Sequence, residues 1–119
     1  MELTSWCEAM YSFWSAKQRL SARERTSAAI MIQENWDASV PTDVVNFLRK
    51  LAPPGVWLHD QHDANGDAHI KAGLVGPSET IPVIDGKLGL SRWQGVFFCE
   101  FDGPRPKRPV VVTVIADRG

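Results

Sequence analysis

Cysteine is scarce in this chain, which has only two among its 119 residues, Cys7 and Cys99. They lie far apart and no CxxC pair is present, so the sequence offers neither a disulfide framework nor a cysteine-based zinc motif. We therefore expect a reduced, cytoplasmic protein. Because Cys99 falls in a predicted strand, we expect it to pack as a small hydrophobic side chain and not to act as a nucleophile.

The chain also lacks an excess of charge and a long apolar run. Lys and Arg number 13 and Asp and Glu number 14, which gives a formal net charge of -1. Nucleic acids and anionic membrane surfaces usually need a strongly basic partner, so we expect the chain to bind neither. No run approaches the length of a membrane span, and the N-terminus lacks the basic start and apolar core of a signal peptide.

What is present is an ordinary globular composition. Hydrophobic residues make up 44% of the chain and charged residues 23%, and this length is sufficient for one domain with a modest core. We therefore expect residues 1–119 to form a single domain.

Apolar residues at helical spacing predict three helices. They cover Met1–Leu20, Pro41–Leu51 and Ala68–Val75. The apolar stripe of the first helix consists of Trp6, Met10, Phe13 and Trp14.

Alternating or continuous apolar segments predict five strands. They are Thr26–Ile32, Thr80–Ile84, Lys87–Leu90, Val96–Asp102 and Val110–Ile115. Asp85-Gly86 between the second and third is the turn pair that two-residue hairpins favour. We expect the strands after Thr80 to form an antiparallel meander with the last strand central. The predicted fold class is α+β, a mainly antiparallel sheet with helices packed on one face.

Glu100 is a candidate site residue because of its position in a strand. Alternation along Val96–Asp102 places it on the same face as Val96 and Phe98. A carboxylate there is costly unless it pairs with a cation, a metal or several donors. The alternative is a glutamate on an edge strand that reaches solvent.

The start of the helix Ala68–Val75 is a candidate anion site. Asn65 or Asp67 can cap it, and His69 and Lys71 lie close to its first turn. Free amides at a helix start attract anions, and a nearby cation and imidazole strengthen that attraction. The alternative is a solvated helix end with an ordinary surface lysine.

Polar residues gather in two further places. Glu34 and Asn35 follow the strand Thr26–Ile32, where strand ends can hold polar groups at a pocket rim. His59 and His62 lie with two aspartates in a polar loop that leads towards His69, a combination that can bind Zn²⁺ or Mg²⁺. Their spacing matches no closed zinc motif, so a solvated loop is the alternative.

A small basic turn follows the strand that contains Glu100. Arg105, Lys107 and Arg108 alternate there with prolines. Such a turn can contact a phosphate, although charge clusters more often form a solvated loop.

Several runs resemble the YjbQ-like family, whose members are often described as secondary thiamine-phosphate synthases. The resemblance extends from about Thr26 to the C-terminus. The runs that carry it are Thr26-Ser27-Ala28, Glu34-Asn35, Asp67–Ala72, Gly76-Pro77-Ser78, Ile81-Pro82-Val83, Trp93-Gln94-Gly95 and Cys99–Arg105.

The resemblance implies an enzyme that joins a pyrimidine diphosphate to a thiazole phosphate with release of pyrophosphate. It implies a small phosphorylated ligand, Mg²⁺ or Zn²⁺, and a homo-oligomer, a trimer, with the pocket near a subunit boundary. Together with the residue patterns above, it gives His69, Glu100 and Glu34 as candidate catalytic residues. The candidate substrate-binding residues are Lys71, Gln94, Asn35, Ser27 and Arg25. The candidate metal ligands are His59, His62 and His69, and either His59 or His62 can be the equivalent of the histidine that the family has in this loop. A non-catalytic protein that binds a metal or a phosphoryl ligand is the alternative function.

The chain departs from the family pattern in three places. Arg25 stands where the family has a histidine, and a guanidinium can hold a phosphate but cannot act as a base or a metal ligand. Ser91-Arg92 replaces the usual Gly-Thr, and residues 1–24 diverge from the family. Within the matching part, we expect Trp93 to be buried and structural and Gln94 to face the pocket.

Overall fold

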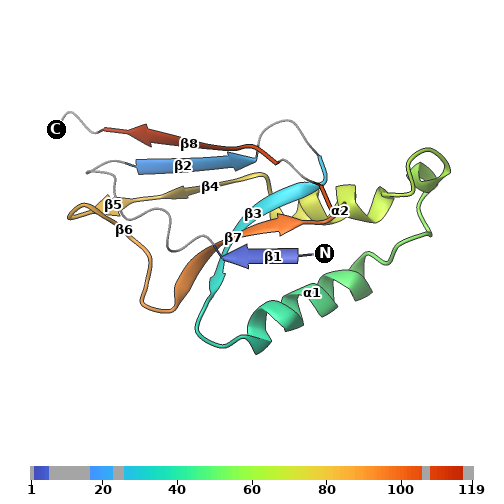
Figure 1. The fold of residues 1–119 in the computed structure, drawn as a ribbon, viewed down its shortest axis with the longest axis horizontal. Helices are drawn as coiled ribbons and strands as arrows, with labels where there is room; N and C mark the ends of the chain where they lie inside the picture. The colour runs from blue at the N-terminus through green and yellow to red at the C-terminus, as the bar shows by residue number, and fades with distance from the viewer. Residues whose placement is uncertain (1, 6–16, 23–25, 106–107, 117–119) are drawn as a thin grey trace.

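The computed structural model describes residues 2–5, 17–22, 26–105 and 108–116 (Figure 1). Its helices are α1 (Ser39–Leu51) and α2 (Gly66–Val75), with a short 3-10 helix, η1 (Leu58–Gln61), between them. The strands are β1 (Glu2–Ser5), β2 (Lys17–Ala22), β3 (Ala28–Glu34), β4 (Ser78–Ile81), β5 (Val83–Ile84), β6 (Lys87–Leu88), β7 (Gln94–Glu100) and β8 (Val110–Ile115).

The strands form two three-stranded antiparallel sheets and a small hairpin. The first sheet has the order β1-β7-β3, the second has the order β4-β2-β8, and β5 pairs with β6. In the first sheet Ala28 lies opposite Glu100, and Glu34 lies opposite Gln94. The start of β3 and the end of β7 therefore share one end of the sheet.

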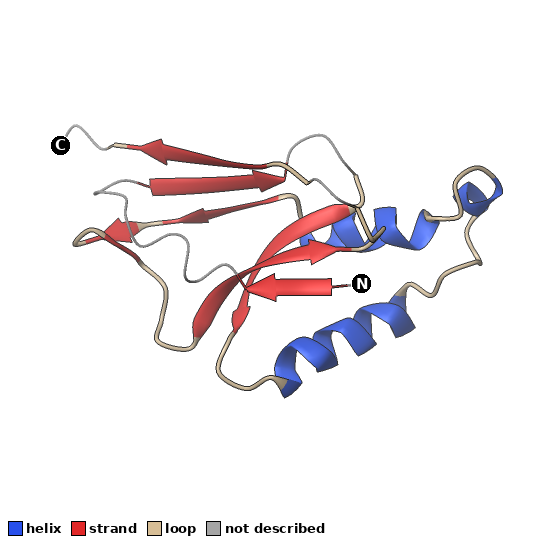
Figure 2. Cartoon of the chain, in the orientation of Figure 1, coloured by secondary structure: helices blue, strands red, loops and turns tan. Residues whose placement is uncertain are grey.

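The core has two parts, one on each face of the first sheet. Leu48 of α1 and Ala68 of α2 pack with Cys99 on one face. Val96, on the other face, packs with Ile81 of the second sheet. The helices thus cover one face of the β1-β7-β3 sheet and the second sheet covers the other (Figure 2). The fold class is α+β, as the sequence predicts.

Several of the predictions that depend only on neighbouring residues in the sequence are confirmed. Asp85 and Gly86 adopt positive φ angles of 51° and 75°, as the predicted two-residue turn requires. Alternation along β7 is confirmed, since Cys99 and Val96 belong to opposite cores. Helix α2 begins at Gly66, two residues before the predicted start, and ends at Val75 as predicted; Gly76 follows it with a positive φ of 99°.

Two predictions of the fold are wrong. The predicted helix Met1–Leu20 has strands at both ends, because β1 pairs with β7 and β2 pairs with β4 and β8; its apolar stripe lies outside the described residues. The meander is also wrong, because β8 pairs with β2 in the other sheet. Among the described strands β8 is an edge and not a centre, and Val112 and Val114 are exposed. Pairing between distant segments overrides local propensity in both cases.

None of the helices in the described part of the chain is long and apolar enough to span a membrane.

Candidate functional site

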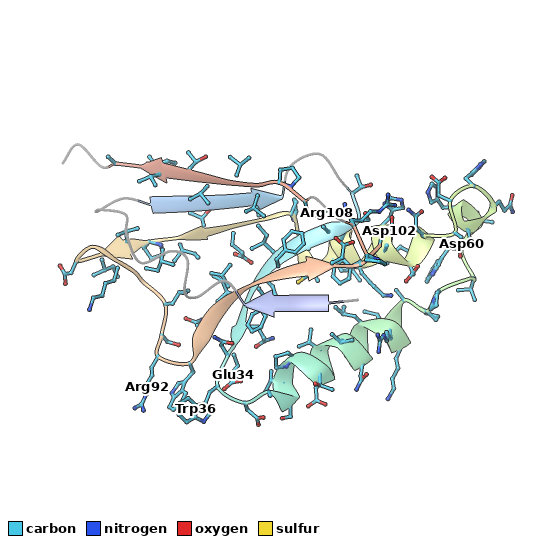
Figure 3. The ribbon with its side chains drawn as sticks, viewed as in Figure 1. Glu34, Trp36, Asp60, Arg92, Asp102 and Arg108 are labelled. Atoms are coloured by element: carbon cyan, nitrogen blue, oxygen red, sulfur yellow. The ribbon has the colours of Figure 1, made fainter. Side chains whose placement is uncertain are left out.

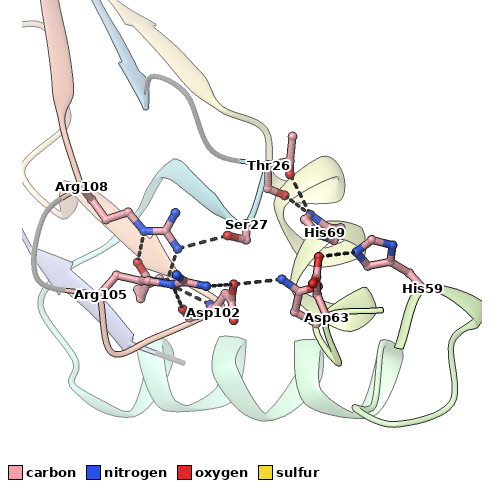
Figure 4. A network of polar contacts seen from close by, with 10 residues as sticks. Thr26, Ser27, His59, Asp63, His69, Asp102, Arg105 and Arg108 are labelled. Carbon is pink, nitrogen blue, oxygen red and sulfur yellow. Dashed lines mark hydrogen bonds and ion pairs between the residues drawn. The ribbon is translucent and has the colours of Figure 1, made fainter. Parts of the chain in front are cut away.

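Polar side chains from four segments meet at the end of the first sheet where β3 begins and β7 ends (Figure 4). The segments are the start of β3, the η1 region, the start of α2 and the loop after β7. We call this group the histidine–arginine cluster; its members are Thr26, Ser27, His59, Asp63, Asn65, His69, Glu100, Asp102, Arg105 and Arg108.

Glu100 and Arg108 form a buried, two-point ion pair in the cluster. Nε and Nη2 of Arg108 each donate to a different carboxylate oxygen of Glu100 at 2.6 Å, and Nη2 also donates to Oγ of Ser27 at 3.1 Å. The backbone N–H of Asp102 donates to the same carboxylate at 2.9 Å. The expectation that Glu100 needs a cation or several donors on this apolar face is confirmed, and Arg108 is the cation.

The carboxylate of Asp102 joins α2 to the loop after β7. Asn65 donates from Nδ2 to Oδ2 of Asp102 at 3.0 Å, and Arg105 donates to the same oxygen from Nη2 at 2.8 Å. Burial acts to raise the pKa of Asp102, but the hydrogen bonds from Asn65 and Arg105 and the charges of the two arginines outweigh it and hold the pKa below its ordinary value. Asp102 is therefore a carboxylate at neutral pH.

His69 contacts a single residue through its Nδ1 atom. Nδ1 lies 2.8 Å from Oγ1 of Thr26 and 3.0 Å from the backbone oxygen of Thr26. The ring of His59 meets the ring of His69 edge to face, with centroids 4.8 Å apart. His59 also approaches Asp63, with Nε2 and Oδ2 at 3.7 Å. Two imidazoles therefore lie together at the rim of the cluster.

Asp60 fixes the η1 segment against the start of α2. It accepts hydrogen bonds from the backbone N–H of Trp57 at 3.0 Å and of Gly66 at 2.8 Å. These two bonds are the main reason that the pKa of Asp60 lies below its ordinary value. Gly66 permits this contact, because a Cβ there would lie 2.7 Å from Cβ of Trp57 and 2.9 Å from Oδ1 of Asp60. The first amide of α2 is thus occupied by a carboxylate of the chain itself.

Lys71 points into the protein and not towards a free helix end. It is only 3% exposed and its Nζ lies 2.6 Å from Oδ2 of Asp67. A phosphate could use Lys71 only by competing with Asp67. The anion-binding role of His69 and Lys71 stays a prediction.

Three of the other predicted site residues lie at the opposite end of β3, about 20 Å along the strand from Ser27. Figure 3 shows Glu34 and Arg108 at opposite ends of the sheet. Glu34 accepts hydrogen bonds from the backbone N–H groups of Trp36 and Asp37 at 3.1 to 3.2 Å. Asn35 and Gln94 are exposed beside it.

Trp93 is not buried, so that prediction is wrong. It is 43% exposed, and it meets Trp36 edge to face at 4.9 Å with Arg92 4.6 Å from its ring centre. The alternation argument failed because Trp93 lies in the turn before β7, not in the strand. Gln94 accepts a hydrogen bond from the N–H of Ser91 at 2.8 Å, which holds this turn.

The predicted metal ligands do not form a three-ligand group. His59 lies close to His69, but the ring of His62 is 6.0 Å from that of His59. Across the described ranges, no three His, Cys, Asp or Glu side chains are placed to hold a metal ion. These residues therefore do not fit a histidine-bound Zn²⁺ in this structure, and binding of Mg²⁺ or Zn²⁺ stays a prediction.

Two more sequence predictions concern single residues. Cys99 is fully buried, and burial raises the pKa of its thiol to about 12. It therefore lacks the thiolate that a nucleophile needs, in keeping with the expected packing role. Arg25 lies outside the described residues.

Sequence reasoning missed Thr26 and Asp102 as members of the cluster. Each lies just beyond a strand end, Thr26 before β3 and Asp102 after β7. Their proximity follows from the antiparallel register of β3 and β7, which the sequence alone does not reveal.

Comparison with known proteins identifies the family. The family model described as UPF0047 protein YjbQ-like matches residues 21–117. A UPF0047 protein of Methanocaldococcus jannaschii is 50% identical over 93 residues, which cover 78% of this chain and 66% of that protein. The chain belongs to the UPF0047/YjbQ family. UPF0047 protein YugU of Bacillus subtilis is 42% identical over 85 residues, which cover 69% of the chain and 62% of YugU. The chain thus spans about two thirds of the length of these UPF0047 relatives.

Solved structures of similar proteins share the fold. A conserved protein of the YjbQ/UPF0047 family from Clostridium acetobutylicum is 34% identical, with a TM-score of 0.86 over 96% of this chain and 91% of that chain. A hypothetical protein from Aeropyrum pernix is 28% identical, with a TM-score of 0.88 over 98% and 90%. The structural match therefore covers more of the chain than residues 21–117, which the family model matches.

Proposed function

We propose that the chain binds a small phosphorylated molecule at the histidine–arginine cluster and acts as an enzyme of the secondary thiamine-phosphate synthase kind. Such an enzyme joins a pyrimidine diphosphate to a thiazole phosphate and releases pyrophosphate. The observation that carries the proposal is that one imidazole, of His69, and two guanidinium groups, of Arg105 and Arg108, lie at the same end of the first sheet.

Each cationic side chain has a separate role in this proposal. The side chain of Arg105 is 42% exposed while it pairs with Asp102, so we expect a phosphoryl oxygen to reach its remaining N–H groups. Arg108 is buried, and its Nη1 has no hydrogen-bond partner among the described residues. An unpaired buried donor costs on the order of 1–3 kcal/mol. A ligand oxygen that reached Nη1 would recover that cost.

A specific observation favours the second candidate, a non-catalytic protein that binds a phosphoryl ligand. The three predicted catalytic groups do not share a site within one chain, because Glu34 lies at the far end of β3 and both oxygens of Glu100 are held by Arg108. The described cations of this end are also matched with carboxylates. Under either candidate, a phosphoryl ligand would have to compete with those carboxylates.

A homo-oligomer would bring Glu34 of one copy close to the histidine–arginine cluster of another copy. The family resemblance implies a trimer with the pocket near a subunit boundary, and a neighbouring copy would then supply Glu34, Asn35 and Gln94. The outer edge of β8, which pairs with no further strand in the described part of the chain, supports association, since five of its six residues are Val or Ile and none is charged. Such an edge readily pairs with another strand.

The test is calorimetric titration with pyrophosphate, followed by an assay of the joined product from the two substrates. We expect the unaltered chain to bind pyrophosphate and His69→Gln to bind it about 10- to 100-fold more weakly, because a charge-assisted hydrogen bond contributes about 1.5–3 kcal/mol. His62→Gln is the matched control and should bind normally. Binding without product would favour the second candidate, and absence of binding would refute both.

A further inference from the structure

His69 makes two contacts with one residue through one atom. Its Nδ1 lies 3.0 Å from the backbone oxygen of Thr26 and 2.8 Å from the Oγ1 of the same residue. The two neighbours have different hydrogen-bonding capacities. A carbonyl oxygen can only accept, whereas a hydroxyl can donate or accept.

Nδ1 either carries a hydrogen or carries a lone pair, and only the form with the hydrogen satisfies both contacts. If Nδ1 carries the hydrogen, it donates to the carbonyl and Oγ1 of Thr26 accepts a share of the same hydrogen. If Nδ1 carries a lone pair, that lone pair faces the carbonyl lone pairs at 3.0 Å and the contact becomes repulsive. The geometry therefore requires the hydrogen on Nδ1.

We infer that Thr26 is a positioning residue that fixes neutral His69 as the Nδ1–H tautomer, so that Nε2 carries the lone pair. Nε2 lies across the ring from Nδ1 and so faces away from Thr26. A hydrogen bond at one ring nitrogen commonly decides which form the other takes at functional histidines.

The inference deepens the proposed function, on which its ligand class rests. A lone pair on Nε2 accepts a hydrogen bond, so the group that meets neutral His69 must bring its own hydrogen. A hydroxyl or a protonated phosphoryl group satisfies this requirement. A fully deprotonated phosphate does so only after His69 has gained a second proton.

The surroundings of the ring leave Thr26 as the residue that decides the tautomer. The ring of His59, from η1, meets the ring of His69 edge to face, which is a ring contact and not a hydrogen bond. Asp63 faces His59 and not His69. Among the described residues, Thr26 alone hydrogen-bonds to the ring of His69.

Nitrogen-15 NMR of the histidine rings in the ligand-free chain tests the assignment directly, because protonated and unprotonated ring nitrogens have distinct shifts. Spectra are recorded well above the ordinary histidine pKa of about 6.5, and His69→Gln identifies the signals. We expect Nδ1 of His69 to be the protonated nitrogen. A hydrogen on Nε2 in the unaltered chain would overturn the inference.

Two variants of Thr26 isolate its hydroxyl. Thr26→Val keeps the shape and the backbone oxygen, and we expect Nδ1 of His69 to remain the protonated nitrogen, because the carbonyl that can only accept is still present. Thr26→Ser, which keeps the hydroxyl as well, should show the same tautomer. Nε2–H as the main form in Thr26→Val would show that the hydroxyl and not the backbone oxygen sets the tautomer, and would overturn the inference. Failure of pyrophosphate binding would refute the proposed ligand but would leave the tautomer result in place.

Discussion

Asn65 and Asp102 lie 37 residues apart in sequence and are joined by a hydrogen bond of 3.0 Å from Nδ2 to Oδ2. The bond ties the residue that precedes α2 to the loop after β7. Asn65 is one of the two residues, with Asp67, that the sequence predicts as a cap, but its side chain makes no such cap and reaches across to the loop instead. The start of the helix and the end of the strand are therefore held together by one carboxylate.

The lowered pKa of Asp102 predicts an acid-dependent loss of stability. Its pKa is lower in the folded chain than the ordinary 3.8, so its contribution is fully present above 3.8 and is lost as the pH falls through the folded value. We expect Asp102→Asn to lower the free energy of unfolding at neutral pH. At a pH below the folded pKa of Asp102, the variant and the unaltered chain should have the same free energy of unfolding. Urea unfolding at a series of pH values measures the difference, and a difference independent of pH would contradict the prediction.

The ion pair between Glu100 and Arg108 predicts a large cost for removing one partner. Arg108→Met leaves a carboxylate buried without its cation, which costs about 3–5 kcal/mol in the free energy of unfolding. Adding Glu100→Gln to that variant should recover part of the loss. Arg105→Met is the control, because Arg105 is half-exposed and its ion pair is worth about 1 kcal/mol or less. Equal losses at Arg105 and Arg108 would show that burial does not set the cost.

Two glycines of α2 form a matched pair for a packing test. Gly66→Ala places a Cβ against Trp57 and Asp60, and we expect it to lower the free energy of unfolding by about 1–3 kcal/mol. Gly73→Ala meets nothing within 4 Å and should raise it by about 0.4–1 kcal/mol. Thermal and urea unfolding compare the two. If both variants raised the free energy of unfolding, the neighbours of Gly66 would be able to move aside at little energetic cost.

The edge of β8 predicts how the chain associates. Val112 and Val114 are exposed on a strand whose described partner is β2 alone. If the oligomer forms through this edge, Val112→Lys should shift it towards the monomer, because a charge on an edge strand opposes pairing. Light scattering after size-exclusion chromatography measures the mass. Leu74→Lys, an exposed apolar position on α2, is the control, and an oligomer that survives Val112→Lys would place the interface elsewhere.

The parts of the fold that the sequence predicts are those with local causes. The turn at Asp85-Gly86 depends on the positive φ of two adjacent residues, and the two faces of β7 depend on strand alternation. Strand β1 pairs with residues 92 to 98 positions away. Strand β2 pairs with residues 57 to 63 positions away in β4 and 88 to 98 positions away in β8. No local pattern encodes such distant partners. For the same reason the apolar run Val110–Ile115 predicts a central strand, whereas it is an edge among the strands that the structure describes.

In the candidate site too, features with a local cause could be predicted and features that depend on distant contacts could not. The need of Glu100 for a cation follows from strand alternation and the cost of burying a carboxylate, so it could be predicted. The identity of the cation, Arg108, depends on how the loop after β7 folds back. Glu34 and His69 are both predicted catalytic residues, but Glu34 is the last residue of β3 whereas His69 contacts Thr26, just before the first. Their separation follows from the tertiary contacts of α2, which the sequence alone does not reveal.

The burial of Cys99 gives the chain an internal probe of its own opening. Its thiol is fully covered between the helices and the first sheet, and burial raises its pKa to about 12. In a Cys7→Ser background, a thiol-labelling reagent would react with Cys99 only when this sheet separates from the helices. The labelling rate would therefore report how often the core of the first sheet becomes accessible to solvent, without any added fluorophore.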